Sequence, residues 1–227
     1  MTRQTLIFDA DDTLWENNVY FERAFEEFCE YLAHSRLSPP EVRAVLDEIE
    51  IVNRELHGYG ALNFGRNLSQ CYERLCERRI GPDDRARVMA FAERILEQPV
   101  ELIDGVAETL AELASRHDLM LFTKGTQDEQ QMKVDASGLA THFSQIVIVR
   151  EKNAASYSEL VACRGLERKL TWMVGNSPRS DINPALEAGL GAVYVPHPRT
   201  WSLEHEEVRA NGRLITVERL TDLRRHF

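Results

Sequence analysis

The sequence predicts a doubly wound, Rossmann-like α/β core whose sheet is parallel, with an all-helical domain inserted after the first strand. From Pro99 onward, short and continuously apolar runs alternate with amphipathic segments. Such alternation is typical of βαβ units in a parallel sheet covered on both faces. Residues 19–98, in contrast, are helical in texture and lack convincing strand runs.

The elements before residue 99 are predicted from helix-start residues, from glycine content and from the spacing of apolar residues. Residues 4–8 are an apolar run ending at Asp9, which suits a buried strand. Apolar residues then recur at spacings of three and four between Phe21 and Leu32, which predicts a helical segment with one apolar face. Ser38, with Glu41 three residues later, is a helix start, and that helix is expected to run to about Leu56. We predict a glycine-rich loop over 57–67. Further helices are expected over 67–79 and 83–98.

The elements after residue 99 alternate. We predict helices over 105–117, 127–137, 154–164 and 181–188, and strands over 119–122, 146–149, 170–174 and 192–195. A further strand is expected over 214–217. Right-handed crossovers are expected between them. The resulting domain division is 1–14 with 99–227 for the α/β core, and 15–98 for the helical domain.

Composition limits the classes of function. The 227 residues carry a formal charge of −10, which argues against a general binder of nucleic acid or anionic membranes. No apolar run approaches the ~20 residues of a membrane span, and we read no signal peptide at the start. The four cysteines lack zinc-finger spacing and are expected to be reduced thiols, so we expect a cytoplasmic protein. Oligomeric state is not readable from the sequence.

Lysine is scarce. Only four of the 27 basic residues are lysines, namely Lys124, Lys133, Lys152 and Lys169. The inserted segment 15–98 contains none.

Polar residues gather where the predicted strands end. Asp9, Asp11 and Asp12 follow the first strand, and Asn176 and Asp181 follow the strand at 170–174. In an open parallel sheet, ligands bind outside the carboxyl ends of the strands. Because carboxylate, carbonyl and amide oxygens are the ligands of Mg²⁺, the pattern favours a magnesium site at this edge.

These motifs together resemble the haloacid dehalogenase superfamily, in its phosphatase branch, with a helical cap inserted after the first strand. The resemblance lies in residues 6–15 (LIFDADDTLW), 119–125 (LMLFTKG), Glu151 with Lys152, and 174–189 (VGNSPRSDINPALEAG). It covers nearly the whole chain in the right order. The first and last motifs are the specific ones.

The resemblance implies a role for each motif residue. Asp9 is the nucleophile that forms an aspartyl-phosphate, and Asp11 is the general acid and then the base. Thr123 and Lys152 hold the phosphoryl oxygens. Lys124 and Lys133 remain rival candidates for the phosphate lysine.

The resemblance also implies a magnesium site. Its ligands are Asp9, the Asp11 carbonyl, Asn176 and Asp181, whereas Asp12 is expected to be a turn or cap residue. The family's last motif usually begins Gly-Asp, and here Asn176 follows Gly175. Because an amide oxygen ligates without charge, we expect a working but weaker metal site.

Candidate substrate contacts lie near the expected loop and the domain junction. Asn63 and Arg66 belong to the glycine-rich stretch, which is either a specificity element or an ordinary hinge. Trp15, with Asn17 and Asn18, stands at the junction, and residues 197–201 follow the last main strand. The sequence predicts a small phosphorylated metabolite as the class of substrate.

Among the other activities of the superfamily, some remain alternatives for this chain and others are disfavoured by its sequence. A phosphosugar mutase shares the motifs, and a non-catalytic binding or regulatory protein is a further alternative. The dehalogenase branch lacks an Asp at the position of Asp11. The phosphonate branch uses a cap lysine, which the segment 15–98 lacks.

Overall fold

The chain forms two compact units. The computed structural model describes residues 2–32, 36–209 and 213–227. One unit comprises Met1–Glu16 with Val100–Phe227, and the other comprises Asn17–Pro99. The domain boundaries expected from the sequence lay after residues 14 and 98. Each unit is described by itself.

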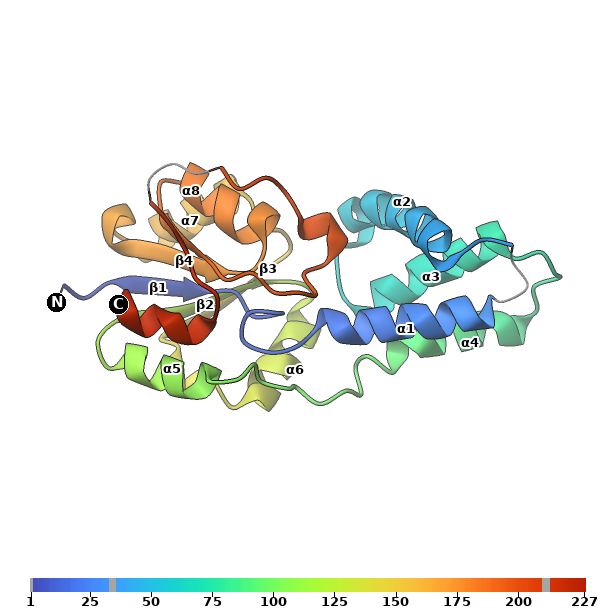
Figure 1. Cartoon of the computed structure of the whole chain (residues 1–227), viewed down its shortest axis with the longest axis horizontal. Coiled ribbons are helices and arrows are strands. Elements are labelled where there is room, and N and C mark those ends of the chain that lie inside the picture. Colours follow the sequence, from blue (N-terminus) through green and yellow to red (C-terminus); the bar gives the residue numbers. More distant parts are fainter. Residues whose placement is uncertain (1, 33–35, 210–212) are drawn as a thin grey trace. The chain divides into compact units, whose positions relative to one another are not determined.

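The first unit is built on a parallel sheet (Figure 1). Its order is β3-β2-β1-β4-β5-β6, and each neighbouring pair is parallel. The bounds are β1 Thr5–Phe8, β2 Asp118–Lys124, β3 Gln145–Val149, β4 Thr171–Gly175, β5 Gly191–Tyr194 and β6 Leu214–Thr216. The predicted doubly wound, Rossmann-like core is confirmed.

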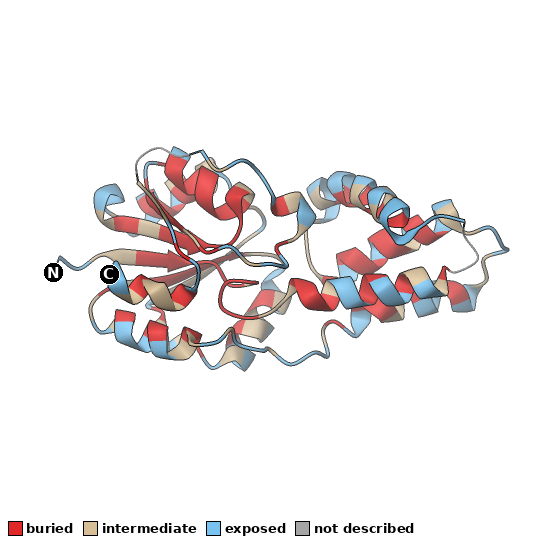
Figure 2. Cartoon of the chain, in the orientation of Figure 1, coloured by how far each residue is buried: buried red, intermediate tan, exposed pale blue. Residues whose placement is uncertain are grey.

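Helices cover both faces of this sheet. Side chains alternate along β1, so that Leu6 and Phe8 belong to one buried cluster and Ile7 to another. The first cluster includes α5 (Val106–Ala114) and α6 (Gln127–Ser137), and the second includes α7 (Ala154–Arg164) and α8 (Asn183–Glu187). Figure 2 shows the inner strands mostly buried and the helices exposed on their outer sides, whereas the edge strand β3 is half-buried. Each large apolar side chain so buried contributes roughly 1.5–3 kcal/mol.

The chain reverses its winding at β1. It proceeds from β1 through β2 to β3 on one side, then returns to β4, β5 and β6 on the other. The carboxyl ends of β1 and β4 therefore form the crevice in which ligands of such sheets bind. The predicted helix over 181–188 begins as a π-helical turn, Pro178–Ile182, and only then becomes α8.

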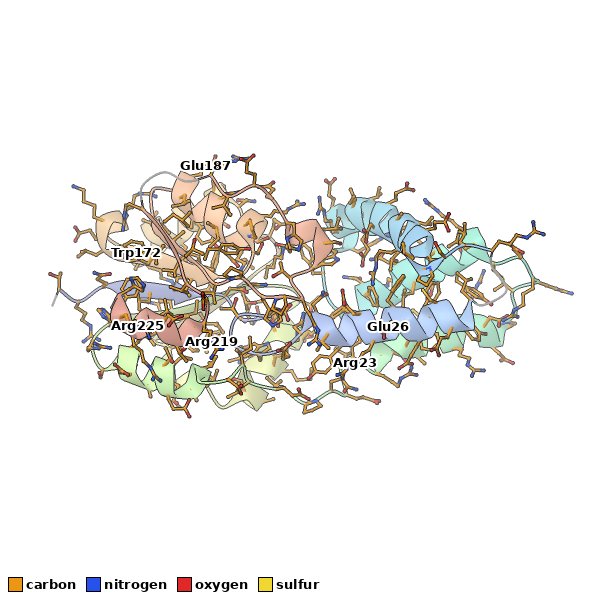
Figure 3. The ribbon with its side chains drawn as sticks, in the orientation of Figure 1. Arg23, Glu26, Trp172, Glu187, Arg219 and Arg225 are labelled. Atoms are coloured by element: carbon orange, nitrogen blue, oxygen red, sulfur yellow. The ribbon has the colours of Figure 1, made fainter. Side chains whose placement is uncertain are left out.

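The backbone of β5 at Gly191 lies directly against the side chain of Trp172 on β4. The ring of Trp172, labelled in Figure 3, packs against Phe227, with centroids 5.5 Å apart. A Cβ atom at Gly191 would lie 2.3 Å from this indole. Glycine is therefore needed on β5 beside Trp172.

The second unit consists of helices around their own apolar core. They are α1 (Asn18–Tyr31), α2 (Pro39–His57), α3 (Ala61–Leu75) and α4 (Pro82–Glu93). Glu41 accepts hydrogen bonds from the backbone N–H and hydroxyl of Ser38, so the predicted helix start is confirmed. Among the described helices, none combines the length and apolar character needed to cross a membrane.

The predicted loop over 57–67 is wrong. Helix α2 continues to His57 and α3 already begins at Ala61. Gly58 and Gly60 have positive φ and make the short turn, but Gly65 lies inside α3. A Cβ atom at Gly65 would lie 2.9 Å from the Cβ of Ala92, so this glycine lets α3 and α4 pack closely rather than marking a loop.

Candidate active site at the carboxyl ends of β1 and β4

A buried lysine joins two aspartates at the crevice. Asp9 follows β1, and its backbone N–H donates to the carbonyl of Val174 on β4, at 2.9 Å. The Lys152 Nζ lies 2.5 Å from Asp9 Oδ1 and 2.5 Å from Asp181 Oδ1. All three side chains are buried. The structure thus brings together residues separated by more than 170 positions in the sequence.

This group carries more negative than positive charge. Burial alone would lower the pKa of Lys152, but the carboxylates of Asp181 and Asp9 hold that pKa above its usual value. Burial and the neighbouring Asp9 raise the pKa of Asp181 to about 7, despite the opposing effect of Lys152. A cation beside these two carboxylates would relieve their repulsion.

Oxygen atoms from both strand ends converge beside the pair. The Thr13 hydroxyl lies 3.1 Å from Asp9 Oδ2 and 3.1 Å from Asn176 Oδ1. Asp181 Oδ2 accepts from the backbone N–H of Ser177, at 2.9 Å, which fixes its carboxylate. Asp9, Asn176 and Asp181 therefore offer hard oxygen donors within one small region. This donor set fits Mg²⁺ and offers no nitrogen or sulfur ligand for a softer metal.

Gly175 makes room for Asp181. A Cβ atom at this position would lie 2.2 Å from Asp181 Oδ2. Only glycine therefore allows the carboxylate to lie against the end of β4.

The Asp11 carboxylate is held by three donors. The Trp15 indole donates to Oδ1 at 2.7 Å, and the Gln130 amide donates to Oδ2 at 2.8 Å. The Lys133 Nζ lies 3.1 Å from both oxygens. Because Gln130 and Lys133 are three residues apart on α6, they reach Asp11 from the same side of that helix.

The three candidate phosphate lysines have different partners. Lys152 lies beside Asp9, whereas Lys133 pairs with Asp11. Lys124 forms an ion pair with Glu204 and donates to the Ser180 hydroxyl at 2.7 Å. The geometry thus distinguishes Lys152 as the lysine next to the first aspartate.

Glu204 is a buried carboxylate with several donors. Its Oε2 accepts from the hydroxyls of Ser177 and Ser180, each at 2.5 Å, in addition to the ion pair with Lys124. Burial alone would raise the pKa of Glu204, but Lys124 and the two hydroxyls bring it down to about 2. This carboxylate braces the turn between Asn176 and Asp181.

The other predicted site residues fall in different places. Thr123 is buried near the carboxyl end of β2. Trp15 is buried in the first unit. Asn63 and Arg66 lie on α3, where Asn63 donates to the carbonyls of His57 and Tyr59 and accepts from Arg66. These last two residues tie the α2–α3 turn together.

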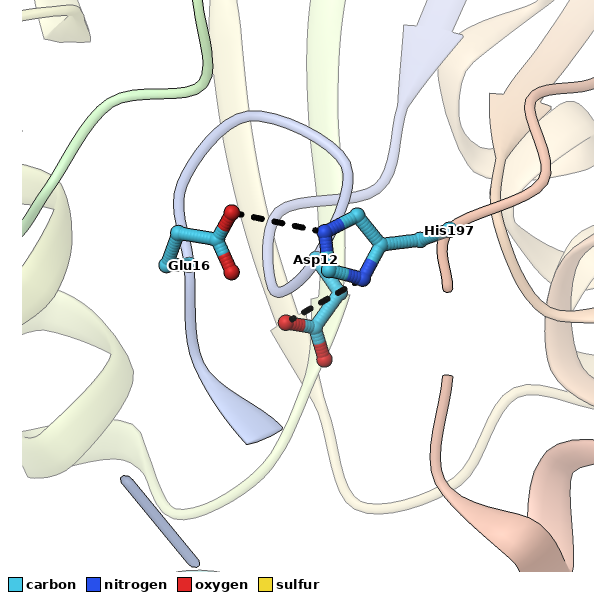
Figure 4. Close-up of side chains that lie close together, drawn as sticks. All are labelled: Asp12, Glu16 and His197. Atoms are coloured by element: carbon cyan, nitrogen blue, oxygen red, sulfur yellow. Dashed lines mark ion pairs between the residues drawn. The ribbon is translucent and has the colours of Figure 1, made fainter. Parts of the chain in front are cut away.

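A second cluster of charged groups lies near the β1 end (Figure 4). Ring nitrogens of His197 lie 3.9 Å from Asp12 Oδ1 and 3.5 Å from Glu16 Oε1. One ligand atom from each residue falls within 4.8 Å of the others, so the trio is a possible cation site. Each ring nitrogen faces a different carboxylate, however, so the imidazole itself lies between the two acidic side chains. Asp12 has φ 58°, as expected of a turn residue.

Several site contacts were not predicted. The sequence indicates no role for Gln130 or Glu204, and it places Thr13 and Thr200 only within longer segments. A usable signal existed for Gln130 and Lys133, which share one side of a helix just after the Thr123–Lys124 motif. Glu204 lies 80 residues from Lys124, and no local pattern connects them.

The sequence matches the family described as haloacid dehalogenase-like hydrolase over residues 6–195. The chain belongs to this family. The match begins inside β1 and ends just after β5, so it includes Asp9, Lys152 and Asp181. Membership makes the chain a haloacid dehalogenase-like hydrolase, and the sequence-based resemblance is confirmed.

Relatives of this haloacid dehalogenase-like hydrolase include a phosphoserine phosphatase from Thermus thermophilus, 32% identical over 153 residues. The alignment covers 65% of this chain and 58% of that phosphatase, less than two thirds of its length. A haloacid dehalogenase-like hydrolase from Xanthomonas campestris is similar in structure, with TM-score 0.85 and 30% identity over 97% of this chain and 88% of that one.

More distant structures share the fold alone. An L-2-haloacid dehalogenase from Xanthobacter autotrophicus has TM-score 0.67 at 17% identity, covering 99% of this chain and 98% of that one.

Proposed function

We propose that the chain is a Mg²⁺-dependent phosphomonoesterase that acts on a small phosphorylated metabolite through an aspartyl-phosphate on Asp9. The observation that carries this proposal is the second carboxylate, Asp11, ordered two residues beyond the nucleophile by Trp15, Gln130 and Lys133. A phosphate ester needs a group that protonates its leaving oxygen, whereas displacement of a halide does not.

The proposed reaction has two steps. Asp9 attacks phosphorus while Asp11, which must enter this step protonated, donates that proton to the departing oxygen, which leaves as an alcohol. Asp11 then removes a proton from water, which attacks the aspartyl-phosphate and regenerates Asp9. Water and the phosphate ester are thereby converted to alcohol and inorganic phosphate.

The charges of the site are proposed to position the phosphoryl group of the substrate. A phosphoryl group approaching Asp9 also meets Asp181, and Lys152 offsets part of this repulsion from its position between the two carboxylates. Thr123, at the end of β2, is proposed to donate its hydroxyl to a phosphoryl oxygen. Mg²⁺ bound by Asp9, the Asp11 carbonyl, Asn176 and Asp181 would supply the remaining positive charge.

The substrate is proposed by class only. The similarity to a phosphoserine phosphatase makes phosphoserine the first compound to test. We propose that the helical unit is a cap domain, with Asn63, Arg66 and Trp15 as candidate substrate contacts. We propose a small phosphorylated molecule as the partner, rather than a nucleic acid or a membrane.

Phosphate release tests the proposal. The purified chain should release phosphate from p-nitrophenyl phosphate with Mg²⁺ and lose this activity with EDTA, and a panel including phosphoserine should then rank substrates. Asp9→Asn should be inactive, and Asp11→Asn should be slowed most with poor leaving groups. Robust turnover by Asp9→Asn would refute the covalent step. Chloride release from 2-chloropropionate with a flat phosphate panel would favour a dehalogenase.

A further inference from the structure

The segment between β5 and His205 reaches back into the site from outside the matched part of the chain. The family match ends at residue 195, and residues 196–204 follow it. Thr200 contacts Asn176, and Glu204 contacts Ser177, so this segment holds both residues that follow β4. It is therefore a candidate for positioning the ligands of the cation.

The hydrogen-bond pattern at Thr200 fixes which group donates. The Thr200 hydroxyl lies 3.0 Å from the His197 carbonyl oxygen, which can only accept. A hydroxyl has one proton, and the structure directs it to this carbonyl, which also accepts from the Thr200 backbone N–H at 3.1 Å. The Asn176 Nδ2, 2.9 Å from Thr200 Oγ1, must then be the donor in the second contact. Both side chains are buried, with Asn176 5% and Thr200 8% exposed.

This arrangement sets the orientation of the Asn176 amide. With Nδ2 on Thr200, the oxygen Oδ1 faces the Thr13 hydroxyl, whose single proton serves either this oxygen or Asp9 Oδ2. Oδ1 is the only atom of this side chain able to ligate a cation. The reversed amide would place Oδ1 against Thr200 Oγ1, and the hydroxyl would have to leave the His197 carbonyl.

We propose that Thr200 is a positioning residue for the cation site, which it serves by accepting from Asn176 Nδ2 and so keeping Oδ1 turned toward Asp9. This inference rests on the proposed Mg²⁺-dependent function. Asn176 and Thr200 act as a matched pair. A carboxylate at position 176 has no proton for Thr200 and would draw the hydroxyl away from His197. The neutral amide of Asn176 is therefore matched to the Thr200 hydroxyl, which lies in residues 196–204.

Calorimetric titration of the full chain with Mg²⁺ tests the pair without using activity. Thr200→Val keeps the shape but removes the acceptor, and it should weaken the Mg²⁺ Kd by about fivefold, equivalent to ~1 kcal/mol. Thr200→Ser should stay within about twofold of the unsubstituted chain. Thr109→Val, at another buried threonine, on α5, is the matched control and should leave the Kd unchanged. Thr200→Ala replaces the valine variant if that variant does not fold.

A double-mutant cycle decides whether the effect runs through the amide. In the Asn176→Asp background either carboxylate oxygen can ligate the cation, so the orientation set by Thr200 no longer matters and Thr200→Val should change the Kd by less than about twofold. The same fivefold loss in that background, or an unchanged Kd in the single variant, would overturn the inference. Absence of Mg²⁺ binding by the unsubstituted chain would overturn both proposals. Binding that depends on Thr200 in a chain without phosphatase activity would overturn the proposed function alone.

Discussion

The ion pair between Glu204 and Lys124 gives the sharpest stability prediction. Glu204→Gln removes the charge but keeps the shape, and it leaves the mostly buried Lys124 ammonium without its carboxylate. Glu151, 4.0 Å from Lys124, is a weaker substitute. Lowering the pKa of Glu204 from 4.5 to about 2 corresponds to about 3 kcal/mol. Breaking a buried pair typically costs ~3–5 kcal/mol, so we expect a loss of about 3 kcal/mol near pH 7.

The pH dependence gives this prediction a direction. The pKa of Glu204 is lower in the folded chain, so its contribution is fully present above about pH 4.5 and disappears as the pH falls toward about 2. Urea unfolding should therefore show a difference between the unsubstituted chain and Glu204→Gln that is largest near pH 7. The difference should shrink steadily below about pH 4.5.

The control for this prediction is an exposed pair. Glu112→Gln removes a carboxylate that contacts Arg116 and Arg224 at the surface, and it should cost less than about 0.5 kcal/mol. Combining Glu204→Gln with Lys124→Met should recover much of the lost stability, because no buried charge is then left without its partner. A Glu204→Gln variant as stable as the unsubstituted chain near pH 7, or a difference that does not change with pH, would refute the reasoning.

Three further predictions concern the site and its surroundings. Gly175→Ala should displace the Asp181 carboxylate and weaken the Mg²⁺ Kd by at least about tenfold in the same titration, and unchanged binding would contradict the close approach at β4. Lys133→Met should release Asp11 and lower kcat for alkyl phosphates more than for p-nitrophenyl phosphate; equal losses on both substrates would count against a role in leaving-group protonation. Asn153→Ala removes the N-cap of α7 and should lower the free energy of unfolding by about 1 kcal/mol in urea, with phosphatase activity retained.

The sheet could be predicted because its strands are short, apolar runs that end at polar residues or glycine. The run ending at Asp9 became β1, and the alternation after residue 99 produced every later strand within a few residues. The helical segment was harder to divide. Glycine content alone suggested a loop over 57–67, but Gly65 serves helix packing, which depends on the neighbour it meets and not on its own propensity.

The site was predictable where it follows a rule about strand ends. Asp9, Asn176 and Asp181 each follow a parallel strand, and strand ends of this kind share one edge. The contacts of Thr200 and Glu204 depend instead on single hydroxyl protons and on a buried charge pair formed across loops. Neither leaves a periodic or compositional signal in the sequence.

The distribution of lysines has a practical consequence for handling the protein. Lys124, Lys133 and Lys152 are all largely buried in ion pairs at the carboxyl edge of the sheet. Lys169 is exposed just before β4 begins, at the opposite edge. Among the lysine amines, an amine-reactive dye or resin should therefore attach at Lys169. Immobilisation through that side chain would leave the crevice facing the solution, which suits surface-based measurements of cation and phosphate binding.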